Sequence, residues 1–513
     1  MKKWFVIHPI LFALFPILFL FSHNIKEMSF RETIRPIVVA VSFALLLWLV
    51  LVLLIKSLHK AGIVTSIFLL FLFSYGHLTD WLFEIFDYLD LVEDCFVVLC
   101  ILPLIAIAWA VIRSQRKLVA LGNYLNIVAI ILVVIPVITI ALHRRFLNMG
   151  GAAKTRAVPA RVGKSKEYPD IYYIILDSYA RADILKEFYH YDNSEFLKYL
   201  AEEGFYIANK SRCNYAETDL SLASSLNLAY LEDLARQMGL ASYDKVPLQK
   251  VIWNSRVVEL LKEHGYLIVA FSSGDITTEV KVSADIFKSP RWSLNEFENL
   301  LLGTTPIPVI LDLLPDKSQF DLHRDRLLYI FDHLADGAEL DAPVFVFAHI
   351  MAPHPPFVFG KNGEKVKPGR KFVLTDRSDH LDQDEYIENY RNQLIFVNKK
   401  IKAAINEILS SSSETPIIIL QGDHGPISKG ADDINPDSVN LKEKMCILNA
   451  YYLPDGGHKK LYEDITPVNT FRVVFNHYFD TNLGLLEDKS YFYEGGRPFS
   501  YKLIEVTDRV NAD

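Results

Sequence analysis

The sequence predicts an α/β protein whose soluble part follows a set of transmembrane helices. Two observations support this prediction. The first 142 residues contain five long runs without Asp, Glu, Lys or Arg, whereas from residue 168 short apolar runs alternate with amphipathic stretches. Long runs without charge are typical of membrane-spanning helices, and the alternation is typical of a mostly parallel sheet covered by helices. The 513 residues are therefore too unevenly composed to form one soluble globule.

The five uncharged runs are each 18 to 25 residues long, enough for a helix to cross about 30 Å of hydrocarbon. They cover residues 4–22, 37–55, 61–79, 95–112 and 118–142. Helices are expected because an open strand would leave backbone groups without hydrogen bonds in lipid. The first run lacks a small-residue cleavage site, so we predict a retained anchor and a five-helix transmembrane domain over residues 1–142.

The charges between the runs predict the orientation. With the N-terminus in the cytoplasm, the cytoplasmic segments carry basic residues and no acidic ones, namely Lys2, Lys3, Lys56, Lys60, Arg113, Arg116 and Lys117. The loop at 80–94 is acidic and falls outside, as the positive-inside rule requires. Arg144 and Arg145 on the outer side disagree with the rule. We predict a multi-pass protein of the cell (inner) membrane with an extracytoplasmic or periplasmic C-terminal domain.

The rest of the chain divides into a basic juxtamembrane linker, residues 143–167, and a soluble domain, residues 168–513. The linker could lie on anionic headgroups or be solvated. Residues 1–150 carry 12 Lys/Arg against 8 Asp/Glu, and residues 151–513 carry 41 against 53, within a total charge of −8. This acidic balance argues against nucleic acid as a partner, because phosphate binding needs a basic face.

The soluble domain shows strand-like and helix-like segments in alternation. The apolar runs are 170–178, 266–274, 343–350, 415–423 and 447–454, and the amphipathic stretches are near 193–203, 249–263, 323–335 and 384–411. In open α/β sheets, ligands bind outside the carboxyl ends of the strands. The residues just after each apolar run are therefore the first candidates for a functional site.

Two of these strand ends carry side chains that bind metals. Asp177 stands at the end of the first run, directly after its apolar residues, and Asp423 ends the fourth run and begins a D-H-G sequence with His424. Two carboxylates and an imidazole could hold a divalent cation. Taken singly, each residue is as well explained by a turn or a helix cap.

Thr218 lies just before a helical stretch and is predicted to be its N-cap. A hydroxyl at a helix N-terminus is also well placed for phosphate chemistry, because free N–H groups favour an anion there. A threonine hydroxyl becomes a nucleophile only when a metal or a base removes its proton. Asp177, Asp423 and His424 could provide that activation, which makes Thr218 a candidate nucleophile.

Two histidines, His349 and His354, flank a proline-rich loop after the third apolar run. A lone histidine there would be structural. Two histidines above a metal site could instead donate to phosphate oxygens or protonate a leaving group. We therefore regard both as candidate substrate-binding residues.

Together these motifs resemble the alkaline phosphatase/sulfatase superfamily over residues 168–480. With five spans in front, the chain resembles the membrane-anchored lipoteichoic acid synthase and phosphoethanolamine transferase branch. The matches are Asp177, Thr218 in T-x-x-S-L, the H-x-x-x-x-H-x-P loop from His349 to Pro356, and D-H-G at Asp423 to Gly425. The resemblance implies an alkaline-phosphatase-like α/β/α sandwich.

The resemblance also implies a chemistry. Asp177, Thr218, Asp423 and His424 would hold one Mn²⁺ or Zn²⁺, with Mg²⁺ as a further option. Thr218 would attack a phospholipid donor, release diacylglycerol and form a phospho-Thr218 ester. A cell-envelope glycan or lipid acceptor would then take the headgroup phosphate, and His354 would contact the substrate phosphate.

Some features depart from the family pattern. Many relatives have Glu where this chain has Asp177, and many transferases carry a second His after D-H-G, a role here unfilled or taken by Lys429. Cys213 is followed by N-Y-A-E, so the C/S-x-P-x-R motif that sulfatases need for formylglycine is missing. Cys213 and Cys446 could pair or remain free thiols. Two alternatives stay open: hydrolysis of the same class of ester, and a non-catalytic lipid-sensing regulator.

Overall fold

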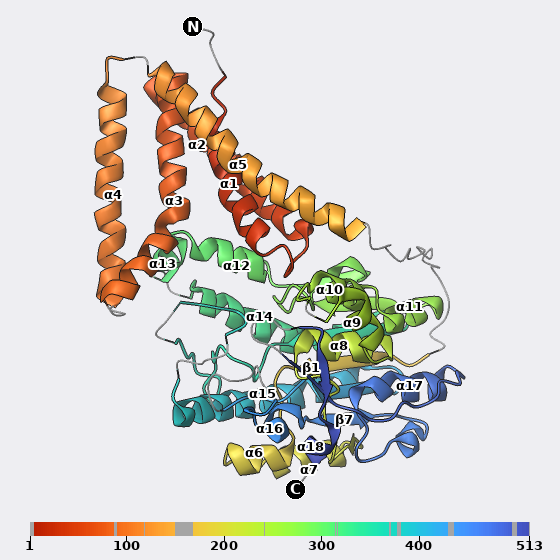
Figure 1. Cartoon of the computed structure of the whole chain (residues 1–513). Helices are drawn as coiled ribbons and strands as arrows, with labels where there is room; N and C mark the ends of the chain where they lie inside the picture. Colours follow the sequence, from red (N-terminus) through yellow and green to blue (C-terminus); the bar gives the residue numbers. More distant parts are fainter. Residues whose placement is uncertain are drawn as a thin grey trace. The chain divides into compact units, whose positions relative to one another are not determined.

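The computed structural model of the protein describes residues 5–86, 90–116, 118–148 and 168–511, apart from residues 241, 313, 315, 369–370, 377–380, 429–435 and 495–499. The chain forms two compact units (Figure 1). The membrane unit comprises Met1–Thr155 and Glu296–Gln319, and the soluble unit comprises Arg156–Asn295 and Phe320–Asp513. Most of the predicted linker 143–167, from residue 149 on, lies outside the described residues, as does Lys429.

Five helices of the membrane unit coincide with the predicted spans: α1 (His8–His23), α2 (Ile34–Ile55), α3 (Leu58–Phe86), α4 (Asp90–Arg113) and α5 (Val119–Asn148). Within the described residues, three segments are long and apolar enough to cross a membrane, namely Phe30–Ile55, Leu58–Leu82 and Val119–His143. α1, with 16 residues, is shorter than these three segments. An apolar helical N-terminal region is thus confirmed, with three helices of full spanning length.

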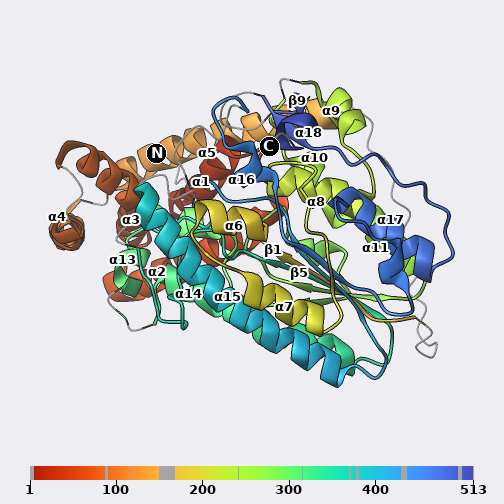
Figure 2. The ribbon, with the colours of Figure 1, turned by 90° about the horizontal axis from the view of Figure 1, so that it is seen from below.

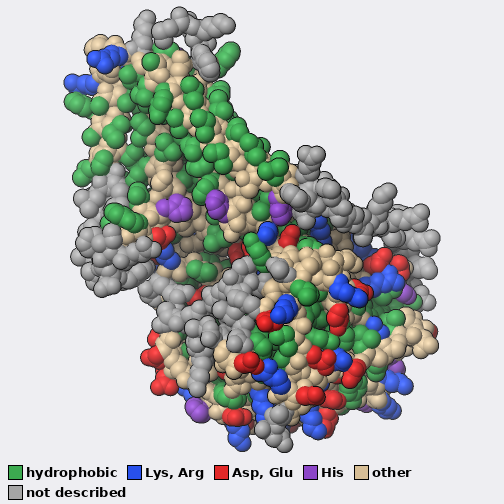
Figure 3. All heavy atoms as spheres, in the orientation of Figure 1, with side chains coloured by type: hydrophobic (Ala, Val, Ile, Leu, Met, Phe, Trp, Pro, Cys, Tyr) green, Lys and Arg blue, Asp and Glu red, His purple; other side chains and the backbone are tan. Residues whose placement is uncertain are grey.

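The membrane unit exposes apolar side chains and buries polar ones. On the face seen in Figure 3, hydrophobic side chains cover much of the described part of its helices. Inside, Asn126 of α5 accepts the backbone N–H groups of Ile7 and His8 at 3.1 and 3.0 Å. These groups lie at the start of α1 and have no partner within the helix. His8 Nδ1 is 2.6 Å from Ser66 Oγ on α3, so polar contacts tie three helices together.

The membrane unit also contains a segment from much later in the sequence. Residues Glu296–Gln319, with helices α12 (Glu296–Gly303) and α13 (Ile307–Asp312), belong to it. The predicted domain boundaries at residues 142 and 168 placed this segment in the soluble domain, whereas it groups with the membrane helices. Its two helices are short, and no run in the segment has the length of a membrane span.

The soluble unit is built on a seven-stranded sheet with the strand order β2-β7-β6-β1-β5-β3-β4. The strands are β1 (Ile171–Leu176), β2 (Tyr206–Ile207), β3 (Leu267–Phe271), β4 (Ile286–Lys288), β5 (Val344–Ile350), β6 (Ile417–Gly422) and β7 (Asn449–Tyr452). β1 pairs in parallel with β5 and β6, and β3 pairs in parallel with β4 and β5. β7 is antiparallel to both of its neighbours, β2 and β6. The prediction of an α/β fold with a mostly parallel sheet is confirmed.

Helices cover both faces of this sheet, with α8, α10 and α11 on one face and α6, α7 and α15 on the other (Figures 1 and 2). The helices of the soluble unit are α6 (Ala182–Phe188), α7 (Ser194–Glu202), α8 (Thr218–Asn227), α9 (Glu232–Met238), α10 (Val246–Trp253), α11 (Arg256–Glu263), α14 (Gln319–His333), α15 (Gln383–Ser411), α16 (Leu441–Met445), α17 (Pro467–Tyr478) and α18 (Thr507–Asn511). Short 3₁₀ turns lie at Phe30–Thr33, Val280–Val282, Leu334–Glu339 and Gly457–Lys460, and β8 (Tyr491–Tyr493) pairs with β9 (Leu503–Glu505). Because both faces are covered, the central strand β1 is buried along its whole length.

The five predicted strands correspond to β1, β3, β5, β6 and β7. The predicted helix at 249–263 is two helices, because Ser255 has an extended backbone and accepts the N–H of Val258 to begin α11. Cys213 and Cys446 are both buried free thiols. Cys213 Sγ lies 3.8 Å from Met445 Sδ, the neighbour of Cys446.

Candidate active site

The carboxyl ends of the two central strands bring Asp177 and Asp423 together. The register of β1 and β6 ends with Leu176 opposite Gly422, so the next residue on each strand is one of the two aspartates. Both are almost completely buried, with exposures of 1% and 0%. Two buried carboxylates side by side need a cation or several hydrogen-bond donors to offset their desolvation.

Ser178 supplies some of these donors. Its backbone adopts a positive φ of 61° directly after β1, and its N–H donates to Asp423 Oδ1 at 3.0 Å. Its hydroxyl donates to Asp177 Oδ1 at 3.0 Å. The hydroxyl of Tyr390 on α15 donates to the Ser178 carbonyl at 2.7 Å, which fixes this turn to a helix that covers one face of the sheet. One residue thus contacts both carboxylates, and sequence analysis did not identify it.

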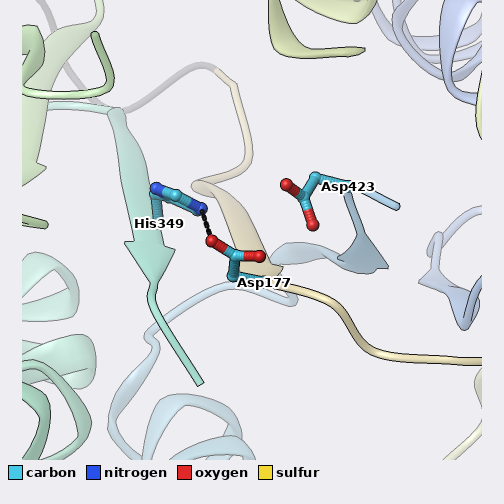
Figure 4. Close-up of side chains that lie close together, drawn as sticks. All are labelled: Asp177, His349 and Asp423. Atoms are coloured by element: carbon cyan, nitrogen blue, oxygen red, sulfur yellow. Dashed lines mark ion pairs between the residues drawn. The ribbon is translucent and has the colours of Figure 1, made fainter. Parts of the chain in front are cut away.

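His349 approaches the carboxylates from the next strand. It lies opposite Ile175 in the register of β1 and β5, and its Nε2 is 3.4 Å from Asp177 Oδ2 (Figure 4). Its other ring nitrogen is 2.8 Å from Thr278 Oγ1, which fixes the orientation of the ring. Ligand atoms of Asp177, His349 and Asp423 all lie within 4.8 Å of one another. One imidazole and two carboxylates make a donor set that suits Zn²⁺ or Mn²⁺, so these residues fit a metal.

Thr218 is the first residue of α8, and the N-cap position belongs to Glu217. The prediction that Thr218 is the N-cap is therefore wrong by one residue. The physical reason is that its hydroxyl is used elsewhere: it donates to Asp423 Oδ2 at 2.7 Å and lies 3.2 Å from His424 Nε2. The hydroxyl is thus presented to the acidic strand ends and not to the helix backbone.

His424 points one ring nitrogen at Thr218 and the other away from it. Its Nδ1 is 2.9 Å from the Gly425 carbonyl, where it acts as a donor. This leaves Nε2 with a lone pair, 3.8 Å from Asp177 Oδ1 and 3.6 Å from Asp423 Oδ2. Lys444 Nζ lies 3.3 Å from His424 Nδ1, and a Cβ at Gly425 would meet the Glu443 carbonyl at 1.9 Å. The D-H-G turn therefore requires glycine at position 425.

His354 stands in the loop after β5, where Ala352–Pro353 and Pro355–Pro356 are cis. Its backbone N–H donates to the Asp177 carbonyl at 3.1 Å. Gln393 of α15 is fully buried and donates to the His354 carbonyl at 2.9 Å, while its side-chain oxygen accepts the N–H of Val358 at 2.8 Å. The loop is thus anchored to both the strand end and the helix below.

The charges around the site favour an ionised Asp177 paired with a protonated His349. Burial alone would raise the pKa of the Asp177 carboxyl, but the imidazoles of His354, His349 and His424 outweigh burial and hold that pKa well below its ordinary value. Burial would lower the pKa of His349, yet its bond to Asp177 and the nearby carboxylates raise it overall. Burial, the largest effect on His424, lowers its pKa. His349 must lose its proton to bind a cation, so metal binding here is coupled to proton release.

The structure thus brings all six predicted site residues to one edge of the sheet: Asp177, Thr218, His349, His354, Asp423 and His424. Sequence reasoning missed Ser178, Thr278, Gln393 and Lys444. Ser178 follows Asp177 directly and could have been found from its position at a strand end. The other three belong to no motif and reach the site only through the fold.

Comparison with known families decides the classification. A profile of the sulfatase family matches residues 169–474, which extend from just before β1 into α17. The chain belongs to the sulfatase family. The predicted resemblance to the alkaline phosphatase/sulfatase superfamily is therefore confirmed. No curated protein sequence matches this sulfatase-family chain.

Solved structures with a similar arrangement include phosphoethanolamine transferases. The periplasmic domain of EptC from Campylobacter jejuni has 14% identity and a TM-score of 0.38, covering 63% of this chain and 93% of its own. The periplasmic domain of EptC from Escherichia coli in complex with Zn has 11% identity and a TM-score of 0.39, covering 67% and 93%. The integral membrane lipooligosaccharide phosphoethanolamine transferase A from Neisseria meningitidis has 13% identity and a TM-score of 0.40, covering 92% and 95%. At these values the similarities carry no conclusion about the reaction of this sulfatase-family protein.

Proposed function

We propose that the protein is a membrane-bound, metal-dependent phosphotransferase that moves a phospholipid headgroup phosphate to a cell-envelope acceptor. One observation carries the proposal: the Thr218 hydroxyl donates to Asp423 at 2.7 Å and lies beside His424, facing the cluster of Asp177, His349 and Asp423. A hydroxyl held against a buried acceptor is an activated nucleophile. The formylglycine motif of true sulfatases is missing from the sequence, which favours threonine over cysteine chemistry.

The chain's own residues account for each step of the proposed reaction. Thr218 Oγ1 attacks the phosphorus of the donor phosphodiester and transfers its proton to Asp423. A bond forms between Oγ1 and phosphorus, and the bond from phosphorus to the diacylglycerol oxygen breaks. His354 supplies a proton to that leaving oxygen. An acceptor hydroxyl then gives its proton to His354 and attacks phosphorus, the bond from phosphorus to Thr218 Oγ1 breaks, and Asp423 returns its proton to the threonine. A bound Mn²⁺, Zn²⁺ or Mg²⁺ would supply positive charge for the phosphate oxygens.

We propose that Asp177, Asp423 and His349 hold the cation together with His424 and Thr218. His349 was expected to bind substrate, but it reaches Asp177 and is buried, which suits a metal ligand better. His354 keeps the substrate role. Elemental analysis of purified protein tests this division: Asp177→Asn and His349→Gln should lose the metal, whereas His354→Gln should keep it. Retained metal in both of the first two variants would contradict the assignment.

Thr218→Ala is the decisive test of the nucleophile. The purified full chain is incubated in mixed micelles with labelled phosphatidylethanolamine or phosphatidylglycerol, and its intact mass is measured. We expect a phosphoethanolamine or glycerophosphate adduct that Thr218→Ala lacks, although the four other proposed ligands should still hold metal in this variant. Thr218→Ser should keep part of the activity, because it keeps the hydroxyl.

The products distinguish transfer from hydrolysis. Label on a glycan or lipid acceptor supports a transferase, and release of the free headgroup phosphate in the presence of envelope extract supports a hydrolase. Headgroup transfer by purified Thr218→Ala protein would overturn the proposed mechanism. Absence of both adduct and metal from the wild-type protein would favour the non-catalytic alternative.

A further inference from the structure

The segment Glu296–Gln319 lies within the part of the sequence that matches the sulfatase family, but it packs with the membrane helices. Arg35, at the start of α2, forms a two-pronged ion pair with Glu298 of α12. The Glu298 side chain is only 8% exposed, so the arginine offsets the cost of burying the carboxylate. Phe297 and Leu301 of the same helix are also buried. One face of α12 is therefore fixed to the membrane unit.

A second contact lies on α3, at Gly76. Its backbone N–H donates to the Thr304 carbonyl at 2.9 Å. A Cβ on Gly76 would lie 2.2 Å from the Gly303 carbonyl oxygen, so the link between α12 and α13 fits into a notch that only glycine leaves open. By contrast, a Cβ on Gly303 would meet nothing within 4 Å. The contact thus requires glycine at position 76 but not at position 303.

These two contacts fix the depth of the segment. α2 begins at Ile34 and α3 ends at Phe86, and the two helices are joined at their other ends, so Arg35 and Gly76 face the same side of the membrane. Trp81, five residues beyond Gly76, is 59% exposed. Exposed tryptophans mark the headgroup region of a bilayer. At a rise of about 1.5 Å per residue, Gly76 lies within about 8 Å of that level.

The segment also exposes apolar side chains. Leu300, Ile310 and Leu314 are 39%, 48% and 50% exposed. Ile310 lies in α13, and Leu314 follows two residues after the end of that helix. The helices of the membrane unit expose leucines in the same way, such as Leu46 of α2 at 62% exposure.

We infer that α12, α13 and Leu314 form an interfacial membrane anchor. Leu300, Ile310 and Leu314 insert into the headgroup and upper acyl region of the leaflet on the side to which α5 leads. The occupant of this apolar face is phospholipid, because the segment is joined to lipid-facing helices at the level of Trp81. A segment of the sulfatase-family sequence thereby binds the membrane surface. The inference rests on the membrane location of α1–α5 and not on the proposed reaction.

Photocrosslinking tests the anchor in the intact chain. Benzoylphenylalanine is introduced singly at Ile310 or Leu314 in full-length protein reconstituted into phosphatidylethanolamine/phosphatidylglycerol vesicles, and adducts are found by mass spectrometry. Leu46 is the positive control. Leu485 is the negative control, because it is 49% exposed in the soluble unit. We expect phospholipid adducts at positions 310 and 314 in yields close to that at 46, and none above background at 485.

A pair of glycine variants shows whether the contact on α3 sets the depth. Gly76→Ala should reduce the lipid adduct at position 310 at least severalfold, whereas Gly303→Ala should leave it unchanged. Adducts at 310 and 314 no stronger than at 485 would overturn the inference, as would crosslinks to a second copy of the chain in place of lipid. Because every labelled position is already exposed, melting temperatures close to wild type are expected and confirm that each protein is folded.

Discussion

The membrane unit and the soluble unit expose similar leucines in opposite surroundings. Leu46 of α2 and Leu485 of the soluble unit are both about half exposed or more. The soluble unit hides its apolar residues in the sheet, where every residue of β1, β5 and β6 is buried. The membrane unit instead hides polar side chains such as His8, Ser66 and Asn126 and presents leucine to its surroundings. Exposure therefore has a meaning only when the solvent, water or lipid, is known.

The comparison also separates two uses of buried charge. In the membrane unit, Glu298 is buried beside Arg35, and the pair fixes one segment to another. In the soluble unit, Asp177 and Asp423 are buried side by side with no arginine or lysine paired to either among the described residues. Such an arrangement is costly for the fold. It persists where the charges serve a ligand, which is why these strand ends are the candidate active site.

Asp423→Asn tests whether the buried carboxylate serves the reaction, and it should lower the reaction rate more than any other change described below. Asparagine keeps the shape and an acceptor for the Ser178 N–H, but it removes the negative charge that receives the Thr218 proton in the proposed mechanism. We expect headgroup release from labelled phospholipid to fall by about 10³-fold or more, as for other catalytic carboxylates. Asp192→Asn, at an exposed carboxylate, is the matched control and should leave the rate unchanged. Turnover of Asp423→Asn within tenfold of wild type, about 1.4 kcal/mol, would contradict the role of this carboxylate.

Leu46→Lys and Leu485→Lys test the two solvents directly. A lysine at the centre of a membrane helix costs about 2.5–3.5 kcal/mol of insertion free energy, whereas a lysine at an exposed site in water changes stability by about 0.5 kcal/mol or less. Leu46→Lys should therefore reduce the membrane-integrated yield, and Leu485→Lys should not. Membrane fractionation followed by thermal melting measures both. Equal yields of the two variants would show that Leu46 does not face lipid.

Much of this contrast could be predicted from composition. Uncharged runs locate the membrane helices because lipid imposes one requirement on every residue of a span. The strand-end residues Asp177 and Asp423 could also be predicted, because a charged residue directly after an apolar run marks the end of a buried strand. Both signals are local in the sequence.

The parts that could not be predicted depend on contacts between distant segments. Thr278 orients His349 across 71 residues, and Gln393 holds the loop around His354 from a helix that contains no motif. The helix start at Thr218 was misplaced by one residue because a hydroxyl suits both a cap and an active site, and only the position of Asp423 decides between them. The segment at 296–319 was missed because helices of eight and six residues leave no long apolar run.

Gln393→Leu tests whether the loop that carries His354 is positioned by α15, with the smallest expected effect. Leucine fits the volume but neither donates to the His354 carbonyl nor accepts the N–H of Val358, so buried backbone groups lose their partners at a cost of about 1–3 kcal/mol. Gln383→Leu, at the exposed start of the same helix, is the matched control. Hydrogen exchange should speed up in residues 351–360 of Gln393→Leu alone. Its KM for phospholipid should rise more than its kcat falls, because in the proposed mechanism His354 contacts the substrate phosphate, while Thr218 and Asp423 keep their places. Faster exchange without a change in KM would mean that the loop is structural and that His354 does not bind the donor.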